Sequence, residues 1–237
     1  MKVLHNFLGV LWAFSLVITL LITSVEAVTY WMPGYYEKEY RKHQVLDNVP
    51  MEMDDLLEVT DEMMAYLRGD REDLHVPTIV GGQEREFFNE REIAHMEDVR
   101  GLFLGALAIR QGCMLLMIMV ILLFLLMRVK IGQVLPRMVC IGTTLFFAVS
   151  VLIAMVVSSD FSKYFVVFHK IFFNNDLWIL DPRTDLLINI VPEPFFMDTA
   201  LRIAAIFGCS VIAVFLLSAL WAWRTKLLQK AGREKGK

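Results

Sequence analysis

The chain has 237 residues, of which 57% are hydrophobic, and its formal net charge is −3. Soluble domains are about 45–50% apolar and do not collect the excess in long uninterrupted stretches. Four stretches here contain no Asp, Glu, Lys or Arg: Phe7–Val25, Gly112–Met127, Met138–Ser159 and Ile203–Trp223. A membrane-spanning helix needs about 20 such residues, and the alternation typical of barrel strands is missing. This composition excludes a soluble protein, a disordered chain and a β-barrel.

We therefore predict an all-α integral membrane protein with transmembrane helices at 7–25, 106–127, 138–159 and 203–223. Acidic and basic residues are concentrated in different segments of the chain. Residues 26–110 hold 19 acidic and 9 basic side chains, residues 158–202 hold 6 and 4, and the other segments have a net charge of +9. Short basic segments stay in the cytoplasm. Both termini, the loop 128–137 and the tail 224–237 are thus expected to be cytoplasmic, with 26–105 and 160–202 forming an extracytoplasmic helical cap.

The first apolar stretch has two interpretations. Lys2 and the sequence Val25-Glu26-Ala27 loosely resemble a signal peptide with a cleavage site. Its 19 apolar residues exceed the usual length of a signal-peptide core, which favours a retained helix. The three cysteines fall inside the predicted spans, where burial makes a thiol inert, so they are expected to be packing residues: Cys113, Cys140 and Cys209.

The two outer segments show patterns of short helices rather than of linkers. Apolar residues of Asp54–Leu67 follow one helical stripe, and Gly69 is expected to end that helix. Val76–Gly82 fits a short strand or a loop, and a helical pattern runs from Asn89 into the second span without a breaker. Later in the chain, Phe161–Phe173 predicts an interfacial helix, Asp181-Pro182 the start of another, and Val191–Phe196 a rigid approach to the last span.

Two of the five histidines are candidates for catalysis. His95 lies one to two turns before the second span, and Asp98 follows at i+3 on the same helix face. A carboxylate on one ring nitrogen would fix the tautomer and leave the other nitrogen free as a base. A surface histidine beside an ordinary helix charge is the simpler interpretation of this spacing. His5, His43 and His75 have no distinguishing neighbours.

His169 has an unusually aromatic environment. Phe165, Phe172 and Phe173 occupy positions i−4, i+3 and i+4, and Phe168 is adjacent. Burial disfavours the imidazolium form and keeps the ring neutral, which suits a general base near pH 7. The alternative is an interfacial histidine that hydrogen-bonds a carbonyl. Two histidines near the same face of the bilayer favour a functional pair.

Several reaction types lack their motifs. The sequence has no nucleophile elbow, no metalloprotease motif, no phosphate-binding glycine loop and no nucleotide fingerprint. His95, Asp98, His169, Asp181 and Asp185 can in principle bind a metal, but no two histidines have the i, i+3 or i+4 spacing of zinc sites, so we expect no metal and no cofactor. The predicted spans hold almost no ionisable residues, which argues against a transporter. An amphiphilic substrate fits the boundary between cap and membrane best.

Two sequence runs resemble one known family. Residues 168–185 (FHKIFFNNDLWILDPRTD) and their continuation 190–196 (IVPEPFF) resemble the signature of the bacterial lipoprotein intramolecular transacylases. The shorter run 92–100 (EIAHMEDVR) is similar to a second signature of that family. The order of four spans with an extracytoplasmic cap fits over essentially the whole chain.

The resemblance implies a specific reaction. The substrate is a diacylated lipoprotein, and its sn-2 acyl chain moves to the α-amino group of the same N-terminal cysteine, giving an N-acyl lyso-lipoprotein. One histidine takes the amine proton and the other stabilises or protonates the glyceryl oxygen; we favour His169 as the base and His95 as its partner. The residues expected to bind or orient the substrate are Asp98, Phe165, Phe168, Phe172, Phe173, Trp178, Asp181, Asp185 and Tyr30.

The resemblance also implies a monomer in the bacterial cell membrane that meets lipoprotein and lipid but no nucleic acid, with its site on the extracytoplasmic side. Two other functions are also compatible with the sequence. One is a non-catalytic membrane protein whose acidic cap binds a partner. The other is an acyltransferase that uses the same histidines between two molecules.

Overall fold

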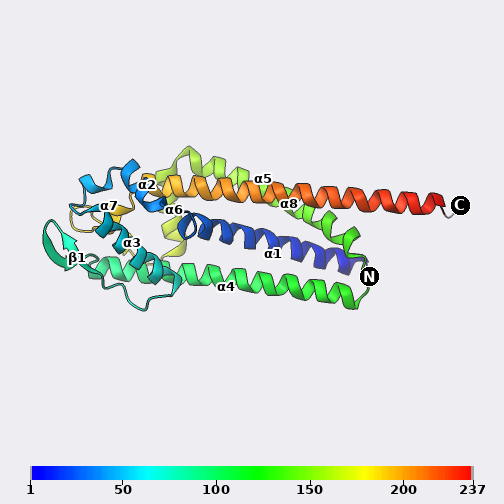
Figure 1. Cartoon of the computed structure of the whole chain (residues 1–237), viewed down its shortest axis with the longest axis horizontal. Coiled ribbons are helices and arrows are strands. Elements are labelled where there is room, and N and C mark those ends of the chain that lie inside the picture. The colour runs from blue at the N-terminus through cyan, green and yellow to red at the C-terminus, as the bar shows by residue number, and fades with distance from the viewer. Residues whose placement is uncertain (1, 236–237) are drawn as a thin grey trace. The chain divides into compact units, whose positions relative to one another are not determined.

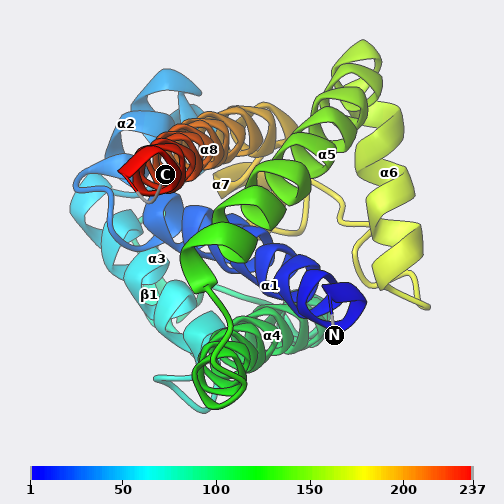
Figure 2. The same ribbon diagram turned by 90° about the vertical axis from the view of Figure 1, so that its right-hand side faces the viewer.

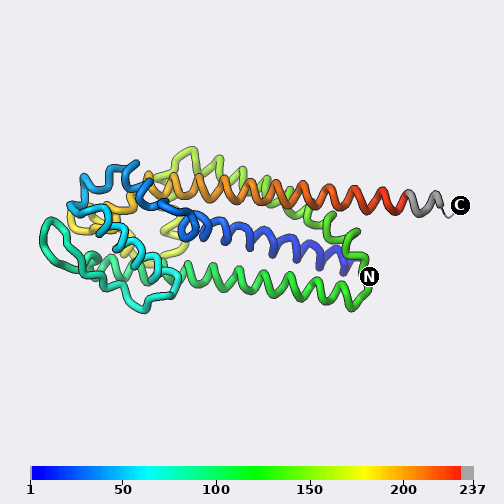
Figure 3. Tube along the Cα trace, viewed as in Figure 1, coloured from blue at the N-terminus to red at the C-terminus, as the bar shows by residue number. Residues whose placement is uncertain are grey.

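The computed structural model describes residues 2–235, with side chains to residue 230, and is mostly helical (Figure 1). The path of the chain can be followed in Figure 3. The elements, in chain order, are α1 (Lys2–Thr29), α2 (Tyr35–Lys42), the 3-10 helix η1 (Val45–Asp47), α3 (Met53–Arg68), β1 (Pro77–Val80), β2 (Gln83–Glu86), α4 (Glu90–Leu126), α5 (Ile131–Ser159), α6 (Phe161–Phe172), α7 (Leu187–Ile190) and α8 (Glu193–Lys235).

The chain divides into two compact units. The first, called the bundle unit here, contains Met1–Val25, Ala108–Val156 and Ile203–Lys237. The second, called the polar unit, contains Glu26–Leu107 and Val157–Arg202. Both predicted catalytic histidines, His95 and His169, belong to the polar unit.

The bundle unit confirms the predicted number of membrane spans. Within the described residues, four helices are long and apolar enough to cross a membrane, and they lie in α1, α4, α5 and α8. Apolar side chains such as Leu115, Leu152 and Leu217 are exposed on these helices, as expected where helices face lipid. The protein is thus an all-α, multi-pass membrane protein.

Helix α1 forms the centre of the bundle unit (Figure 2). In the most apolar 18-residue stretch of α1, 28% of the stretch is buried, whereas the corresponding share is 11% in each of the other three membrane-spanning helices. Ala13 packs with Val120 and Phe124 of α4 and with Val139 of α5. A Cβ added at Gly142 would lie 2.9 Å from the Cβ of Ala13, so the small residue lets α1 and α5 approach closely.

The polar unit contains the elements expected from the outer segments. Helix α3 ends at Gly69, which adopts the left-handed conformation (φ 86°) that glycine tolerates best, as predicted. The ambiguous stretch before Gly81 forms strand β1, which pairs antiparallel with β2. Gly81 and Gly82 both have positive φ and make the two-residue hairpin turn. Helix α4 begins at Glu90 and continues through Arg110 without a break, also as predicted.

One predicted helix start is wrong. Residues after Asp181 form a turn, and the following helix, α7, begins only at Leu187. The Asp181 carboxylate accepts from the backbone N–H of Arg183 and pairs with its guanidinium, while the Asp185 carboxylate accepts from the backbone N–H of Asp181. These local bonds satisfy the backbone in a turn, which removes the need for a helical continuation.

Candidate functional site

His169 is held in one tautomer by its own helix. Asp160 caps α6 by accepting from the backbone N–H of Lys163, at 3.1 Å. Near the other end of α6, the His169 ring lies with Nδ1 2.7 Å from the carbonyl oxygen of Phe165. A carbonyl only accepts, so Nδ1 is the donor and carries the ring proton. The lone pair of the neutral ring is therefore on Nε2.

Four aromatic side chains surround His169. The ring centroid of Phe165 lies 4.4 Å away, that of Phe168 5.5 Å and that of Phe173 5.6 Å. Trp178 stacks on the imidazole at 4.9 Å with an interplanar angle of 28°. The residue is only 8% exposed, and desolvation lowers the pKa of its ring below the ordinary value of 6.5. His169 is therefore neutral at pH 7.

His95, which belongs to α4, lies beside His169. The two imidazole centroids are 6.2 Å apart, and Phe173 contacts both rings, its centroid lying 5.3 Å from that of His95. His95 is 7% exposed, and its Nδ1 has no hydrogen-bond partner among the described residues. Burial, with a smaller contribution from His169, lowers the pKa of His95 to about 4. The structure thus brings together the two histidines that the sequence suggested, both in the neutral form.

The expected partner of His95 binds elsewhere. Asp98 accepts a hydrogen bond from the side-chain amide of Asn175 at 2.8 Å, and no bond joins it to His95 in the described part of the chain. Asn175 also accepts the indole N–H of Trp178 on its backbone oxygen at 3.0 Å. Asn175 therefore connects the helix of His95 to the tryptophan that stacks on His169. The direct Asp98–His95 hydrogen bond expected from the i+3 spacing is not formed.

Two buried carboxylates fix the start of α4. Glu92 accepts from the backbone N–H of Asn89 at 2.7 Å and from that of Leu187 at 2.6 Å, and burial raises the pKa of its carboxyl group. The Asn89 side chain donates to Asp185 and accepts from the N–H of Glu92, which forms a capping box. The spacing Asn89-x-x-Glu92 is the sequence signal for this arrangement. These bonds tie the turn before α7 to the helix that carries His95.

Three other predicted site residues lie away from the histidine rings. Phe172 is exposed and contacts Phe168. Asp181 lies in the exposed turn described above. Tyr30 donates to the carbonyl of Met64 at 3.0 Å and lines a cavity of about 430 Å³, whose other lining residues include Tyr35, Leu57, Asp61 and Arg68. Their roles in substrate binding stay predictions.

Asn175→Ala is expected to lower kcat by about 3- to 10-fold, because each lost hydrogen bond contributes about 0.5–1.5 kcal/mol to the local arrangement. The affected bonds are those to Asp98 and to the backbone N–H of Leu177. Steady-state assays with a diacylated lipopeptide, the substrate class that the sequence resemblance implies, would measure kcat and KM separately. Asn174→Ala, at the exposed neighbouring position, is the matched control and should retain the wild-type kcat. Equal effects of the two substitutions would contradict a positioning role for Asn175.

The fold and the site define a class of protein, namely a multi-pass membrane protein that encloses two neutral histidines among aromatic rings in its polar unit. A family model described as lipoprotein intramolecular transacylase Lit matches residues 10–196. The chain belongs to this family, which is a family of acyltransferases. The resemblance of the two sequence runs is thereby confirmed at the level of the family.

Solved structures show the same fold. The membrane integral lipoprotein intramolecular transacylase Lit from Bacillus cereus matches with a TM-score of 0.80 and 20% identity, covering 96% of this chain and 100% of the other. Two further structures of the Bacillus cereus protein carry a histidine-to-alanine and a histidine-to-arginine mutation, with TM-scores of 0.76 and 0.73 at 20% identity. Each match covers 95% of this chain, and it covers 97% of the alanine variant's chain and 95% of the arginine variant's chain. A comparison with curated protein sequences found no match.

Proposed function

We propose that this chain transfers the sn-2 acyl group of a diacylglyceryl-cysteine lipoprotein to the α-amino group of the same cysteine. The amine nitrogen attacks the ester carbonyl carbon and loses a proton. The bond from that carbon to the glyceryl oxygen then breaks, and the oxygen gains a proton, giving an N-acyl lyso-lipoprotein. The observation that carries the proposal is the pair of neutral histidines 6.2 Å apart in one aromatic enclosure.

His169 is the proposed general base. Its Nδ1 proton is engaged by the carbonyl of Phe165, so the free Nε2 can accept the proton of the attacking amine. An α-amino group has a reference pKa of about 7.7–8.0 and is largely protonated in water at pH 7. Transfer into an enclosure of aromatic rings disfavours the ammonium as it disfavours the imidazolium. The same desolvation thus lowers the pKa of both partners and keeps proton transfer between them feasible.

His95 is the proposed partner on the oxygen side. With a pKa of about 4 it is a neutral imidazole at pH 7, which still offers one ring N–H as a hydrogen-bond donor. A neutral donor in a dry site stabilises the oxyanion of the tetrahedral intermediate and costs little reorganisation. The proton that His169 takes from the amine can return to the departing glyceryl oxygen. No net proton is consumed, which fits two histidines that are both neutral at rest.

The intramolecular reaction needs no enzyme nucleophile, which agrees with a sequence that contains no nucleophile elbow. Donor and acceptor belong to one substrate, so the enzyme must mainly hold the reacting ends together, which contributes up to about 7–11 kcal/mol in well-oriented cases. Phe165, Phe168, Phe173 and Trp178 provide the apolar wall for this purpose. The acidic outer segments and basic ends of the chain support an extracytoplasmic site, in the membrane orientation proposed from the charges.

Mass spectrometry of a lipoprotein product tests the proposal. The chain is produced in cells together with a diacylated lipoprotein, and the N-terminal peptide is examined for N-acyl, S-monoacylglyceryl cysteine. Two lipoproteins of different sequence, one with deuterated acyl chains, are then mixed with purified enzyme. Intramolecular transfer keeps the label on its own peptide, whereas an intermolecular acyltransferase would exchange it. An unchanged diacyl peptide would overturn the proposal.

The pH dependence follows from the lowered pKa values of the two histidines. Below its pKa, His169 is protonated on Nε2 and cannot accept the amine proton, so kcat/KM is expected to fall towards acid pH. This inflection should lie below pH 6.5, because burial shifts the pKa downward, and it should be separate from an inflection of the substrate amine near 7.7–8.0. Nitrogen NMR of labelled His169 should show an Nδ1–H tautomer that titrates in the same low range. A histidine inflection above pH 6.5 would contradict the assignment.

A further inference from the structure

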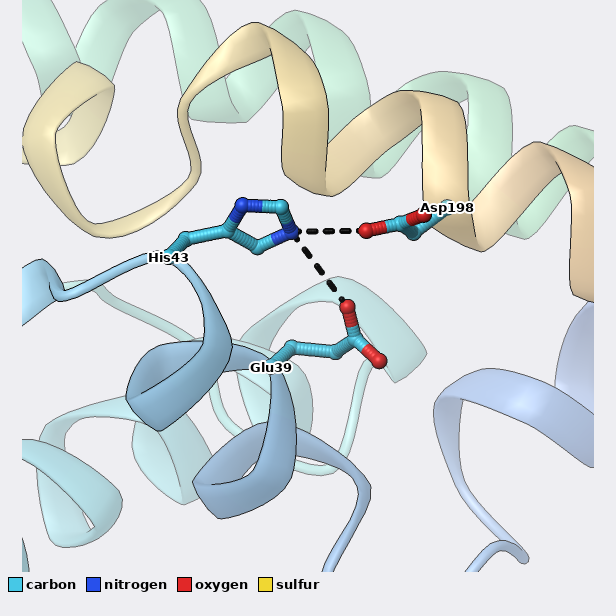
Figure 4. A group of neighbouring side chains, drawn as sticks. All are labelled: Glu39, His43 and Asp198. Carbon is cyan, nitrogen blue, oxygen red and sulfur yellow. Dashed lines mark hydrogen bonds and ion pairs between the residues drawn. The ribbon is translucent and has the colours of Figure 1, made fainter.

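A second group of polar side chains lies in the polar unit, on elements that carry neither catalytic histidine. Glu39 and His43 are one turn apart on α2 and at its C-cap, and Asp198 lies in the second turn of α8 (Figure 4). Their ligand atoms all lie within 4.8 Å of one another. His43 Nε2 is 2.7 Å from an Asp198 oxygen and 3.5 Å from Glu39 Oε2. One imidazole and two carboxylates thus converge on one point.

Glu39 supplies a separate observation that points to a ligand. Its side chain is 0% exposed, and Oε2 has no hydrogen-bond partner in the described part of the protein. The other oxygen, Oε1, accepts from Arg202 at 2.6 Å. Figure 4 shows the carboxylate directed at the His43 ring. Glu39 Oε2 accepts no hydrogen bond in the described part of the protein and has only the ion-pair contact with His43 Nε2 at 3.5 Å, so its burial is poorly compensated. A cation placed between Glu39, His43 and Asp198 would supply the missing interaction.

Two cationic side chains already touch the group, and they differ in how easily they can leave. Arg202 binds the Glu39 oxygen that faces away from His43, and it can stay there as an outer partner that orients the carboxylate. Lys42 pairs with Asp198 on the oxygen that faces His43, and its side chain is 50% exposed. It can therefore swing into water. An incoming ion needs to displace only Lys42 and the proton on His43 Nε2. That proton passes to solvent and Nδ1 holds or takes up one proton, so the imidazole binds the ion as a neutral ligand.

We propose that Glu39 Oε2, His43 Nε2 and Asp198 Oδ2 form a binding site for a divalent transition-metal ion, for which Zn²⁺ is the best match. Zinc takes imidazole and carboxylate ligands at about 2.0–2.2 Å, so tetrahedral ligand atoms lie about 3.3–3.6 Å apart. The separation of 3.5 Å between His43 and Glu39 already fits this geometry. The His43–Asp198 pair needs to open by less than about 1 Å. A water molecule can complete the coordination.

The metal would fasten α2 to the start of α8. Tyr36 and Tyr40 of α2 stack against Phe195 of α8, and the adjacent Phe196 contacts Phe165, which borders His169. Phe195 and Phe196 also contact each other, so ring contacts run from α2, the helix that carries Glu39, to the proposed base. The metal would stabilise this part of the polar unit and take no part in the transfer chemistry, so its test is independent of the transacylase proposal.

Calorimetry with ZnCl₂ tests the site on the purified, chelator-treated full chain in detergent. One Zn²⁺ per chain is expected, with a rise in Tm on binding. His43→Ala and Glu39→Gln should each weaken binding at least about 10- to 100-fold, whereas Lys42→Met should tighten it because a competing cation is removed. His75→Ala is the matched control at an exposed histidine and should bind as the wild type does. Cobalt(II) in place of zinc should give the visible spectrum of a low-coordinate nitrogen and oxygen site.

A second control tests whether the two proposed catalytic histidines, rather than His43, bind the zinc ion. The double variant His95→Ala/His169→Ala should retain zinc binding in full, and loss of binding there would move the metal to that pair and overturn the proposal. Zinc that binds equally well to His43→Ala would also overturn it, as would the absence of binding to the wild-type chain. Should Glu39→Gln fail to fold, Lys42→Met decides the matter: unchanged or weaker binding in that folded variant contradicts the site.

Discussion

Replacing His169 by alanine is expected to lower kcat for N-acyl lyso-lipoprotein formation by about 10²- to 10⁴-fold, the usual contribution of a general base. The substitution removes His169 Nε2, the ring nitrogen that has the free lone pair because the Nδ1 proton is held by the carbonyl of Phe165. KM should change less, because the aromatic wall remains. The measurement is the rate of product formation by mass spectrometry, with a diacylated lipopeptide in detergent or lipid.

The control for this result is a neighbouring substitution. Lys170→Ala alters the adjacent exposed residue of α6 and leaves the aromatic enclosure intact, so it should keep a kcat within a few-fold of wild type. His169→Gln restores a polar side chain of similar length but no base, and it should be as slow as the alanine variant. Activity within tenfold of wild type in His169→Ala would remove this residue from the mechanism.

The second large effect is expected at His95. His95→Ala should lower kcat by about 10²- to 10³-fold, which is the usual cost of one lost donor to an oxyanion. The conservative variants distinguish which ring nitrogen acts. The side-chain amide of Asn can imitate Nδ1 and that of Gln can imitate Nε2, so the variant that recovers part of the activity identifies the donor. The measurement is again kcat, compared across the three variants in one preparation.

Loss of packing must be separated from loss of chemistry in this case. His95 is 7% exposed, so truncation leaves a cavity beside Phe173 and is expected to lower the Tm of the protein. His95→Phe fills the space without a donor. If His95→Phe has wild-type thermal stability and also wild-type kcat, then His95 is a packing residue only. The double variant with His169→Ala should be little slower than either single variant, because groups that act as a unit are not additive.

Much of the fold could be predicted because its signals are local or compositional. The four apolar stretches, the glycine that ends α3 and the unbroken pattern from Asn89 each depend on neighbouring residues in the sequence. The start of α7 could not be predicted in this way. Asp181-Pro182 has the residues of a helix start, but the side chains of Asp181 and Asp185 bond the turn to itself and to Asn89, which lies 96 positions away from Asp185. The local sequence allows either a helix start or a turn after Asp181, and these hydrogen bonds favour the turn.

The candidate site shows the same division. His169 could be singled out because three of the rings around it lie within four residues of it in the sequence, and that pattern predicts an apolar environment. Asp98 has the spacing of a partner for His95, yet its carboxylate accepts a hydrogen bond from Asn175, which lies in a loop far away in the sequence. Asn is common in turns and carries no signal of its own. The His43 group was likewise hidden, because Asp198 is 155 positions away from His43.

The hydrogen bond that orients His169 has a consequence for which substitutions this chain can tolerate. Its acceptor is the backbone oxygen of Phe165, which every amino acid supplies. Exchange of this phenylalanine for another apolar residue would alter the wall of the enclosure but leave the tautomer intact. The orientation of the proposed base is thus protected against substitutions at position 165. The aromatic side chains around the proposed base can therefore change, and with them the acyl chains that fit there, while Nδ1 of His169 keeps its hydrogen-bond acceptor.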